Sequence, residues 1–325
     1  MRYKLKEIFE LQMGKTPSRH NSSYWNTGDY KWISIADLSN VGKYISETKE
    51  TISESAVIES GIKIIPANTV VMSFKLSIGK TAITAEDMYS NEAIMAFHDK
   101  KIVELLPEYI YYLFKFKDWN VGSNKAVMGK TLNKATLAEM EIEIHTIEEQ
   151  KEIIKVLDQI SNIIANRKQE LIQLDNLIQA RFVEMFGDPI MNPKGWNVVT
   201  IKDIVTEVRY GTSKPAVEGG KYPYLRMNNL TLNGQLDLKN LKYIDIPDEE
   251  IEKCVVRKGD VLFNRTNSID LVGKTAVFNL VEDMVIAGYI IRIRLNEKIL
   301  PEVFSQYMNL KALKDVLRAM AKGAV

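Results

Sequence analysis

The chain has 325 residues, enough for two domains of ordinary size. Hydrophobic residues make up 46% and charged residues 26%, a balance typical of folded globular proteins, which excludes a disordered chain. The formal net charge of +1 gives no overall attraction to nucleic acid, so any contact with DNA has to come from local patches.

Cysteine usage and hydrophobic patterning limit the compartment. A single cysteine, Cys254, excludes an intrachain disulfide. The chain is charged from Arg2 onward, which argues against a signal peptide, and no run approaches the roughly 18 apolar residues that span a membrane. We therefore expect a cytoplasmic protein.

The first 145 residues are predicted to form a mixed domain. Residues 107–116 open with Pro and Glu, as helices often do. Residues 137–145 largely alternate between apolar and acidic, which predicts a last strand. Other runs rich in β-branched and aromatic residues predict strands at 31–35, 69–74, 81–84 and 93–97.

Residues 146–186 contain neither Gly nor Pro and are predicted to form one long helix. Thr146 and Glu149 have the spacing of a capping box at its start. Gly187, followed by Pro189, is the usual signature of a helix C-terminus. At about 1.5 Å per residue, such a helix is roughly 60 Å long.

One face of this helix carries apolar residues at alternating steps of four and three. A strict seam of this kind packs against another helix rather than against a sheet. The alternative, an amphipathic helix in an ordinary core, is disfavoured because average helices have about a dozen residues. The seam, which Arg167 and Arg181 interrupt, consists of Ile153, Leu157, Ile160, Ile164, Leu171, Leu174 and Ile178.

The two flanks of the helix resemble each other. Matching blocks recur in the same order, and their offset stays between about 191 and 197 residues, which indicates an internal repeat. A glycine follows the third block in each copy, at Gly42 and Gly234. The paired blocks are 3–9 with 196–204, 14–17 with 211–215, 30–38 with 222–230, 65–73 with 256–264, 78–83 with 272–277, and 107–112 with 301–306.

The repeat predicts an α+β architecture of two similar mixed α/β domains joined by a long helix of the coiled-coil type. We expect domains at 1–145 and 188–325, with the helix at 146–187. The second copy has no counterpart of residues 129–145 or of the long helix. We therefore expect the second domain to be shortened at its C-terminal side.

The motifs argue against catalysis. Gly-Lys-Thr occurs at 79–81, 129–131 and 273–275, but the additional glycine of a phosphate-binding loop is missing. The histidines lack the spacing of a metal site. We also find no local catalytic-triad motif, no dinucleotide-binding turn and no tetrapeptide of a DNA amino-methyltransferase. No cofactor, metal site or catalytic residue is predicted.

Paired loops instead carry side chains suited to base edges and phosphates. For any single residue, a solvated polar loop is the alternative. The two copies share their frame residues but differ in their polar loop residues, as expected for one scaffold that reads two sequences. The DNA-binding candidates are Lys15, Thr16, Arg19, His20, Ser73, Lys75, Ser77, Lys125 and Lys130 in the first copy, and Arg209, Thr212, Lys214, Arg226, Asn228, Asn264, Arg265 and Asn267 in the second.

With these features the chain resembles the specificity subunits of type I restriction-modification systems. The most specific marks are the helix block 147–154, the segment 186–196 that restarts the second domain, and the Gly-Asp-Val-Leu block at 259–262. The resemblance implies two target-recognition domains, each reading one half of a split DNA target, and a spacer formed by antiparallel helices. It also implies partner modification subunits that transfer methyl groups, restriction subunits that cleave, and a specificity subunit without catalysis of its own.

The chain departs from this pattern because no second helix is available for the seam. We expect the helix to associate with its counterpart in a second copy or to pair with helices of the modification subunits. Two alternative functions remain: a DNA-specificity module of another methyltransferase or defence system, and a coiled-coil scaffold that binds no DNA.

Overall fold

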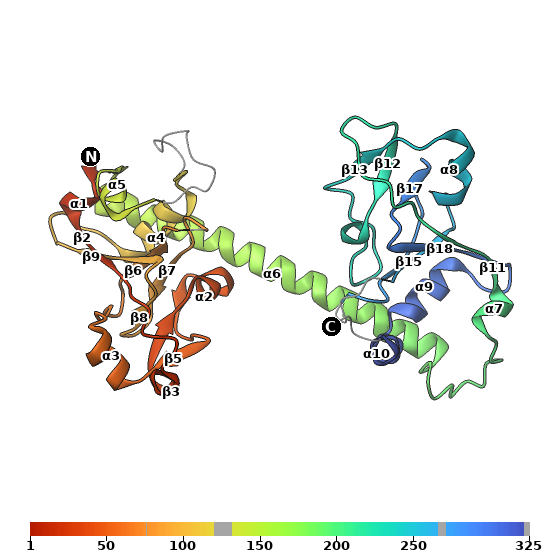
Figure 1. Ribbon diagram of the computed structural model, residues 1–325, viewed down its shortest axis with the longest axis horizontal. Coiled ribbons are helices and arrows are strands. Elements are labelled where there is room, and N and C mark those ends of the chain that lie inside the picture. Colours follow the sequence, from red (N-terminus) through yellow and green to blue (C-terminus); the bar gives the residue numbers. More distant parts are fainter. Residues whose placement is uncertain (76, 120–131, 266–270, 322–325) are drawn as a thin grey trace. The chain divides into compact units, whose positions relative to one another are not determined.

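A computed structural model describes residues 1–75, 77–119, 132–265 and 271–321 (Figure 1). The chain divides into two compact units, Met1–Asn166 and Arg167–Val325, each with its own sheets and core. The fold is α+β, as predicted. The helix α6 (Ile147–Phe186) contributes its first half to the first unit and its second half to the second.

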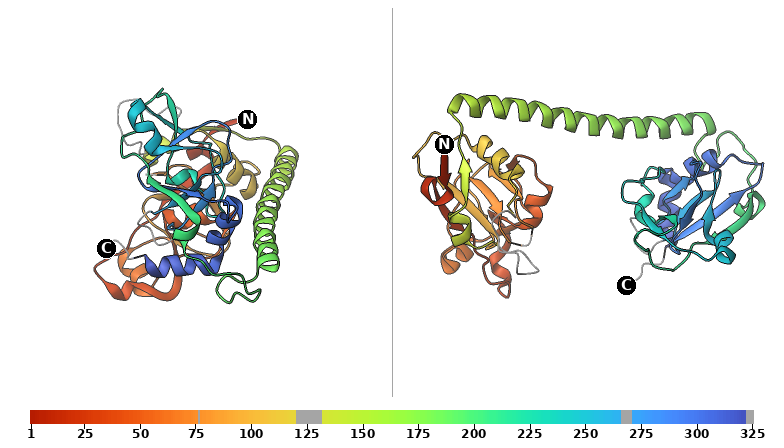
Figure 2. Two further views of the ribbon diagram at one scale, coloured as in Figure 1. Left: turned by 90° about the vertical axis from the view of Figure 1, so that its right-hand side faces the viewer. Right: turned by 90° about the horizontal axis from the view of Figure 1, so that it is seen from above.

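The predicted ends of α6 are confirmed. The hydroxyl of Thr146 accepts a hydrogen bond from the Glu149 backbone N–H at 3.3 Å, and the Glu149 carboxylate accepts one from the Thr146 N–H at 2.9 Å. At the other end, Gly187 has a φ of +87°, which ends the helix. The indole of Trp196 donates to the Phe186 carbonyl at 2.7 Å and satisfies one of the last helical acceptors. Figure 2 shows α6 unbroken between these ends.

The first unit folds around a five-stranded sheet. The strands are β1 (Arg2–Lys4), β2 (Phe9–Met13), β3 (Trp25–Ile33), β4 (Tyr44–Ile45), β5 (Glu50–Ile52), β6 (Val70–Ser73), β7 (Thr81–Thr84), β8 (Tyr89–Ser90), β9 (Ile94–Asp99) and β10 (Glu141–Glu143). The main sheet has the order β2-β9-β6-β7-β4, beside a smaller sheet β5-β3-β8 and the pair β1-β10. The helices are α1 (Leu5–Ile8), η1 (Ser22–Tyr24), α2 (Ile35–Asn40), α3 (Glu54–Ser60), α4 (Pro107–Phe116) and α5 (Lys134–Ala138).

Both faces of this sheet are buried. Successive side chains of a strand point to opposite sides, so each strand contributes to two cores. Met72 and Phe97 face one core, in which Phe114 of α4 packs with its ring centre 4.7 Å from that of Phe97. Val71 and Ala96 face a second core beneath α2 and the smaller sheet. The helix α4 therefore lies between the main sheet and the first turns of α6.

The second unit repeats this plan. Its strands are β11 (Val205–Tyr210), β12 (Tyr222–Leu225), β13 (Lys242–Ile244), β14 (Val255–Val256), β15 (Val261–Asn264), β16 (Thr275–Val277), β17 (Met284–Ile286) and β18 (Ile290–Leu295). The sheets have the orders β11-β18-β15-β16 and β13-β12-β17-β14. They match β2-β9-β6-β7 and β5-β3-β8, down to the parallel pairing of β3 with β8 and of β12 with β17. The helices are α7 (Ile201–Ile204), η2 (Met227–Asn229), α8 (Asp248–Cys254), α9 (Pro301–Asn309) and α10 (Lys311–Met320).

The structure confirms the predicted helix at 107–116 and corrects two predicted strands. The run 31–35 ends in a helix, because Ser34 and Asp37 form a capping box that starts α2. The segment 137–145 begins inside α5, whose start is capped by Asn133, and only β10 remains extended. In both places a local capping side chain outweighs the strand pattern.

Candidate nucleic-acid interface

In the first unit, the loop after β2 crosses the end of β8, the strand that comes before β9 in the chain. In the second unit, the loop after β11 crosses the end of β17, which comes before β18. The backbone N–H of Lys15 donates to the Ser90 carbonyl at 2.8 Å. In the second unit the Thr212 N–H donates to the Ile286 carbonyl at 2.9 Å. Equivalent residues of the repeat thus make equivalent hydrogen bonds.

Close backbone contact explains why both copies have glycine at the start of this loop. A Cβ at Gly14 would lie 2.2 Å from the carbonyl oxygen of Asn91. At Gly211 it would lie 2.1 Å from that of Ile286. Both glycines therefore allow the loop to pack closely against the neighbouring backbone.

A third segment, the hairpin between β6 and β7 or between β15 and β16, joins at the same place. The Phe74 N–H donates to the Ala93 carbonyl at 3.0 Å, and the Arg265 N–H donates to the Tyr289 carbonyl at 3.1 Å. We call the surface formed by these three segments the loop site. It comprises 14–20, 73–79 and 90–93 in the first unit, and 211–215, 264–273 and 286–289 in the second, with 76 and 266–270 outside the described residues.

In the first unit, an acidic side chain stands among the predicted DNA-binding residues. Glu92 is exposed on the turn between β8 and β9, and its carboxylate accepts a hydrogen bond from the Thr16 hydroxyl. Partial burial raises the pKa of Glu92. The bond from Thr16 and the charges of Lys75 and Arg19 oppose this, and the pKa is lowered overall. The carboxylate therefore stays ionised at neutral pH.

Arg19 is held on an aromatic surface. Its guanidinium lies 3.6 Å from the ring centre of Trp25 and 5.0 Å from that of Trp32. It also makes two hydrogen bonds to Glu50, at 2.6 and 3.0 Å. These partners fix the direction of Arg19.

Two predicted contact residues are buried. Ser73 and Asn264 occupy equivalent positions, and each side chain is 0% exposed. The Ser73 hydroxyl donates to the Ser77 carbonyl, and the Asn264 amide donates to the Leu271 carbonyl at 3.0 Å. Their side chains close the hairpin loop instead of facing a ligand, which corrects the prediction that they read bases.

The loop site of the second unit presents cationic and aromatic groups. The guanidinium of Arg265 lies 4.8 Å from the ring centre of Tyr210 and donates to the Gly288 carbonyl at 3.3 and 3.4 Å. Tyr210 and Tyr289 are 58% and 55% exposed. Arg265 is thus oriented by neighbours while remaining exposed.

The other candidates differ in their surroundings. Several basic side chains already have a partner inside their own unit, which lowers their capacity to bind phosphate. These pairs are Lys15 with the Ser60 carbonyl, Arg209 with Glu207 at 3.0 Å, Lys214 with Glu250 at 2.9 Å, and Arg226 with the Asn240 carbonyl at 3.2 Å. His20, Ser77 and Asn228 are exposed, whereas Lys125, Lys130 and Asn267 lie outside the described residues.

Comparison with known proteins decides the family. The profile of the type I restriction modification DNA specificity domain matches residues 1–176 and 193–324. The chain belongs to this family.

Among similar specificity subunits, the type I restriction enzyme MjaIX specificity subunit of Methanocaldococcus jannaschii is 32% identical over 250 residues, covering 70% of this chain and 57% of that protein. The EcoR124I/EcoR124II specificity subunit of Escherichia coli is 25% identical over 165 residues, covering 49% of this chain and 40% of that protein. The chain thus spans about half the length of the curated relatives it matches.

A solved chain from a study of complex assembly and conformational transition of the type I R-M system shares the fold. It has a TM-score of 0.53 at 14% identity, covering 100% of this chain and 84% of that one.

In this specificity-domain chain, the seam of α6 has two parts. Ile153 and Leu157 are half-buried against the core of the first unit, so they already have a partner within the chain. The remaining seam residues are about half exposed, at 46% for Ile160, 50% for Ile164, 63% for Leu171, 54% for Leu174 and 52% for Ile178.

Each specificity domain holds α6 through the loop around the aligned glycines Gly42 and Gly234. In the first, Asp158 of α6 pairs with Lys43 and accepts a hydrogen bond from Tyr112. In the second, Asp175 of α6 accepts a hydrogen bond from the Asn233 amide at 2.9 Å. The same loop thus contacts the helix by different chemistry.

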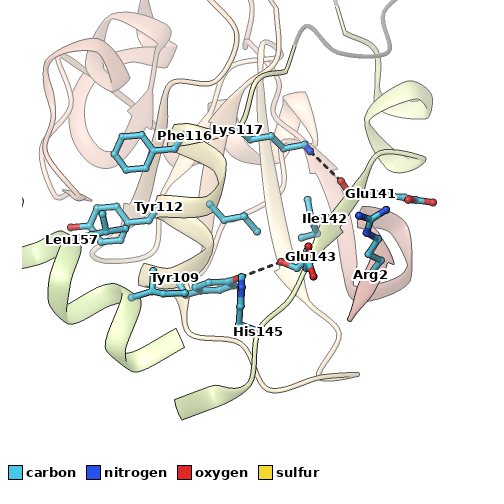
Figure 3. A pocket seen from close by; sticks show the side chains of 12 residues that line it. Arg2, Tyr109, Tyr112, Phe116, Lys117, Glu141, Ile142, Glu143, His145 and Leu157 are labelled. Atoms are coloured by element: carbon cyan, nitrogen blue, oxygen red, sulfur yellow. Dashed lines mark hydrogen bonds between the residues drawn. The ribbon is translucent and has the colours of Figure 1, made fainter. Parts of the chain in front are cut away.

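A groove of about 620 Å³ lies where α4, β10 and the start of α6 meet (Figure 3). Tyr112, Phe116 and Leu157 form its apolar wall. The hydroxyl of Tyr109 lies 2.7 Å from Nδ1 of His145 and donates to the Glu143 carbonyl at 3.1 Å. These contacts tie α4 to the strand that leads into α6.

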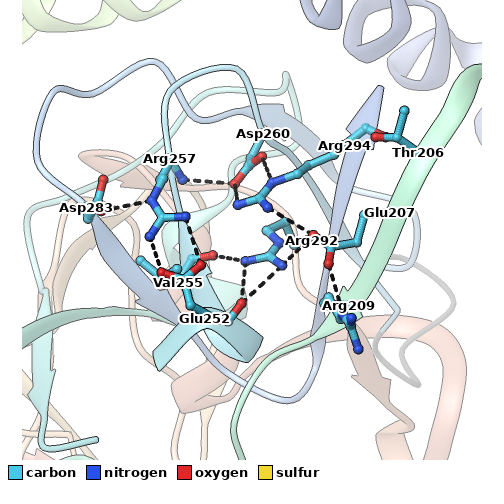
Figure 4. Close-up of polar contacts among 10 residues, drawn as sticks. All are labelled: Thr206, Glu207, Arg209, Glu252, Val255, Arg257, Asp260, Asp283, Arg292 and Arg294. Carbon is cyan, nitrogen blue, oxygen red and sulfur yellow. Dashed lines mark hydrogen bonds and ion pairs between the residues drawn. The ribbon is translucent and has the colours of Figure 1, made fainter. Parts of the chain in front are cut away.

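A balanced ion network lies within the second specificity domain (Figure 4). Arg292 is 1% exposed and pairs with Glu207 at 2.7 Å, and Arg294 bridges Glu207 and Asp260. Because as many carboxylates as guanidiniums take part, the cluster offers no surplus charge to a phosphate. Its members are Arg209, Arg257, Arg292 and Arg294 with Glu207, Glu252, Asp260 and Asp283.

The Gly-Lys-Thr motifs at 79–81 and 273–275 serve the hairpins. Gly79 and Gly273 have φ of +89° and +80° and lie two residues before the returning strands β7 and β16. Lys274 donates to the Leu230 carbonyl at 2.9 Å, and Lys80 donates to the Ser39 hydroxyl. Both lysines tie the hairpin to a neighbouring loop or helix, while the third motif lies outside the described residues.

Within residues 1–75, 77–119, 132–265 and 271–321, no group of His, Cys, Asp and Glu is arranged to hold a metal ion. In the same ranges no helix combines the length and apolar character needed to cross a membrane.

Proposed function

We propose that this chain is the sequence-specific DNA-recognition subunit of a type I restriction-modification complex. One observation carries the proposal: two loop sites share the same backbone hydrogen bonds but present different side chains. Sequence-specific readers need this combination, because a common frame sets the approach to the groove while the side chains select the bases. We assign the target-recognition domains to 1–145 and 188–325, and the spacer to 146–187.

The exposed groups suit double-stranded DNA. Arginine beside tyrosine, as at Arg265 and Tyr210, supplies a donor pair for guanine or phosphate on an aromatic support. Lys75 supplies a donor in the first domain. A helix of 40 residues is about 60 Å long, which equals the length of roughly 17 base steps of DNA. A split target with an unread gap follows.

The partners follow from this role. The chain itself supplies no catalysis in our proposal, modification subunits transfer the methyl group, and restriction subunits cleave. The exposed seam from Ile160 to Ile178 is the surface for a partner helix, supplied by a second copy or by a modification subunit. Because its substrate is cellular DNA, the complex works in the cytoplasm.

Methylation sequencing tests the proposal. Cells that carry the modification subunit gene together with this chain should show a split motif methylated on adenine, absent when the chain is omitted. If the same methylated motif is found but the chain works with an effector other than a restriction subunit, the result would favour a specificity module of another defence system. No change in methylation, together with no salt-dependent DNA binding by the purified chain, would leave only the scaffold alternative.

Sedimentation tests the seam. At micromolar concentration the chain alone should form a dimer, or a complex with the modification subunit when that subunit is added. A monomer in both conditions would contradict the proposed helix pairing.

A further inference from the structure

We propose that Glu92 determines specificity in the first target-recognition domain by accepting a hydrogen bond from the exocyclic amino group of a base, with cytosine the favoured partner. This inference rests on the proposed function and adds a residue that the sequence pattern of basic and amide side chains does not reveal.

The position of Glu92 is the first support. It lies on the turn between β8 and β9. The carbonyl of the next residue, Ala93, accepts a hydrogen bond from the Phe74 N–H of the hairpin. The Thr16 hydroxyl, from the loop that follows β2, donates to the Glu92 carboxylate. Glu92 therefore occupies the point where all three segments meet, and it is exposed there.

Charge supplies the second support. A carboxylate repels DNA phosphates, so it cannot contribute to backbone binding. An ionised carboxylate can only accept hydrogen bonds, and the amino group of cytosine is the major-groove donor with which it pairs best. Partial burial raises the pKa of Glu92, but the hydrogen bond from Thr16 and the charges of Lys75 and Arg19 lower it overall and keep the carboxylate ionised. The Thr16 bond leaves the second carboxylate oxygen for a base.

The second domain supplies the third support. Gly288 stands where the first domain has Glu92, and the guanidinium of Arg265 donates to its carbonyl. The same point of the scaffold thus presents an acceptor in one domain and a donor in the other. A protein that recognises two unlike half-sites needs such a difference between its domains. The effect of Glu92 on base preference should therefore be confined to one half of the target.

The test compares methylated motifs from cells with the modification subunit and either the wild-type chain or Glu92→Gln. The wild-type motif should contain, in one half, a position that favours cytosine. Glu92→Gln should reduce the preference at that position by roughly 5- to 150-fold, the range of a base contact. The other half should stay unchanged, which shows that the variant folds and assembles.

Matched variants separate reading from support. Glu86→Gln removes an exposed carboxylate of the same domain, paired with Lys31 outside the loop site, and should leave the motif unchanged. Thr16→Val should weaken the same position by less than Glu92→Gln does. An unchanged motif in Glu92→Gln, or equal changes in both halves, would overturn the role of Glu92 while leaving the proposed function intact. A wild-type chain that directs no motif would overturn the proposed function and this inference with it.

Discussion

At equivalent positions of the two main sheets, β9 carries Ala96 and β18 carries Arg292. Ala96 is fully buried among apolar side chains of the first unit. Arg292 is as deeply buried, but its guanidinium reaches Glu207 and the carbonyls of Glu252 and Val255. One scaffold therefore accepts either a methyl group or a charge at this point, provided that the charge is paired and hydrogen-bonded.

The loop sites differ in the same way. The backbone bonds that join the three segments are common to both units, while Glu92 and Phe74 in one unit correspond to Gly288 and Arg265 in the other. Main-chain contacts thus hold the shared shape and leave the side chains free to vary. The experiments below test that separation.

The largest effect is expected for Arg292→Ala. The substitution opens a cavity and leaves Glu207 with fewer partners, so it should lower the free energy of unfolding of the second unit by about 3–5 kcal/mol. Arg209→Ala removes an exposed partner of the same carboxylate and should lower the free energy of unfolding by less than about 1 kcal/mol. Hydrogen exchange of residues 290–295 measures both. Equal effects of the two substitutions would show that the contribution of Arg292 to stability does not depend on its burial.

The glycines of the frame should come next. Gly14→Ala and Gly211→Ala each force a Cβ against a backbone carbonyl and should destabilise their own unit by up to about 3 kcal/mol. Gly42→Ala is the control, because nothing lies within 4 Å of its Cβ and its φ is not positive. Thermal unfolding of the three variants tests the point. A tolerated Gly211→Ala would break the equivalence of the two loop sites.

In the second unit, Lys314 should make the free energy of unfolding depend on pH. Burial, with the charges of Arg318 and Lys274, lowers the pKa of Lys314 to about 8, while in the unfolded chain it is 10.5. The unfolded chain then binds the proton more tightly, so the free energy of unfolding should rise as pH increases from about 8 to about 10.5. Denaturant titrations of the wild type and Lys314→Met measure the difference. The same slope in both proteins would contradict the assignment.

The smallest effects concern the attachment of α6. Asp158→Asn weakens an ion pair with Lys43 that is partly exposed, so about 1 kcal/mol should be lost locally. Asp175→Asn changes a hydrogen bond from Asn233 and should cost about half of that. Hydrogen exchange of residues 150–160 and 170–180 reports each attachment. A larger loss at Asp175 would reverse this part of the comparison.

Local and periodic features were predictable from the sequence. The limits of α6 follow from Thr146, Glu149 and Gly187, because helix capping depends on residues next to each other in the chain. The repeat and the helix at 107–116 followed from pattern alone. The strand at 31–35 was wrong at its end, because the pattern of apolar residues hides the cap that Ser34 and Asp37 form.

The candidate site was only partly predictable. Polar residue type predicted that Thr16, Arg19, Lys75 and Arg265 contact DNA, but residue type cannot tell an exposed side chain from a buried one. Residue type therefore did not reveal that Ser73 and Asn264 are buried. The proposed role of Glu92 did not follow from the sequence, because an acidic residue does not suggest DNA binding until its neighbours are known.

The sequence by itself determined the long helix, its caps, the seam and the two-fold repeat of an α+β domain, because these depend on neighbouring residues and on periodicity. Tertiary structure alone decided which loop residues meet, which are buried, that Ile153 and Leu157 pack within the first unit, and that Arg292 is balanced by Glu207. These outcomes depend on contacts between segments that are distant in the chain, and no local pattern encodes such contacts.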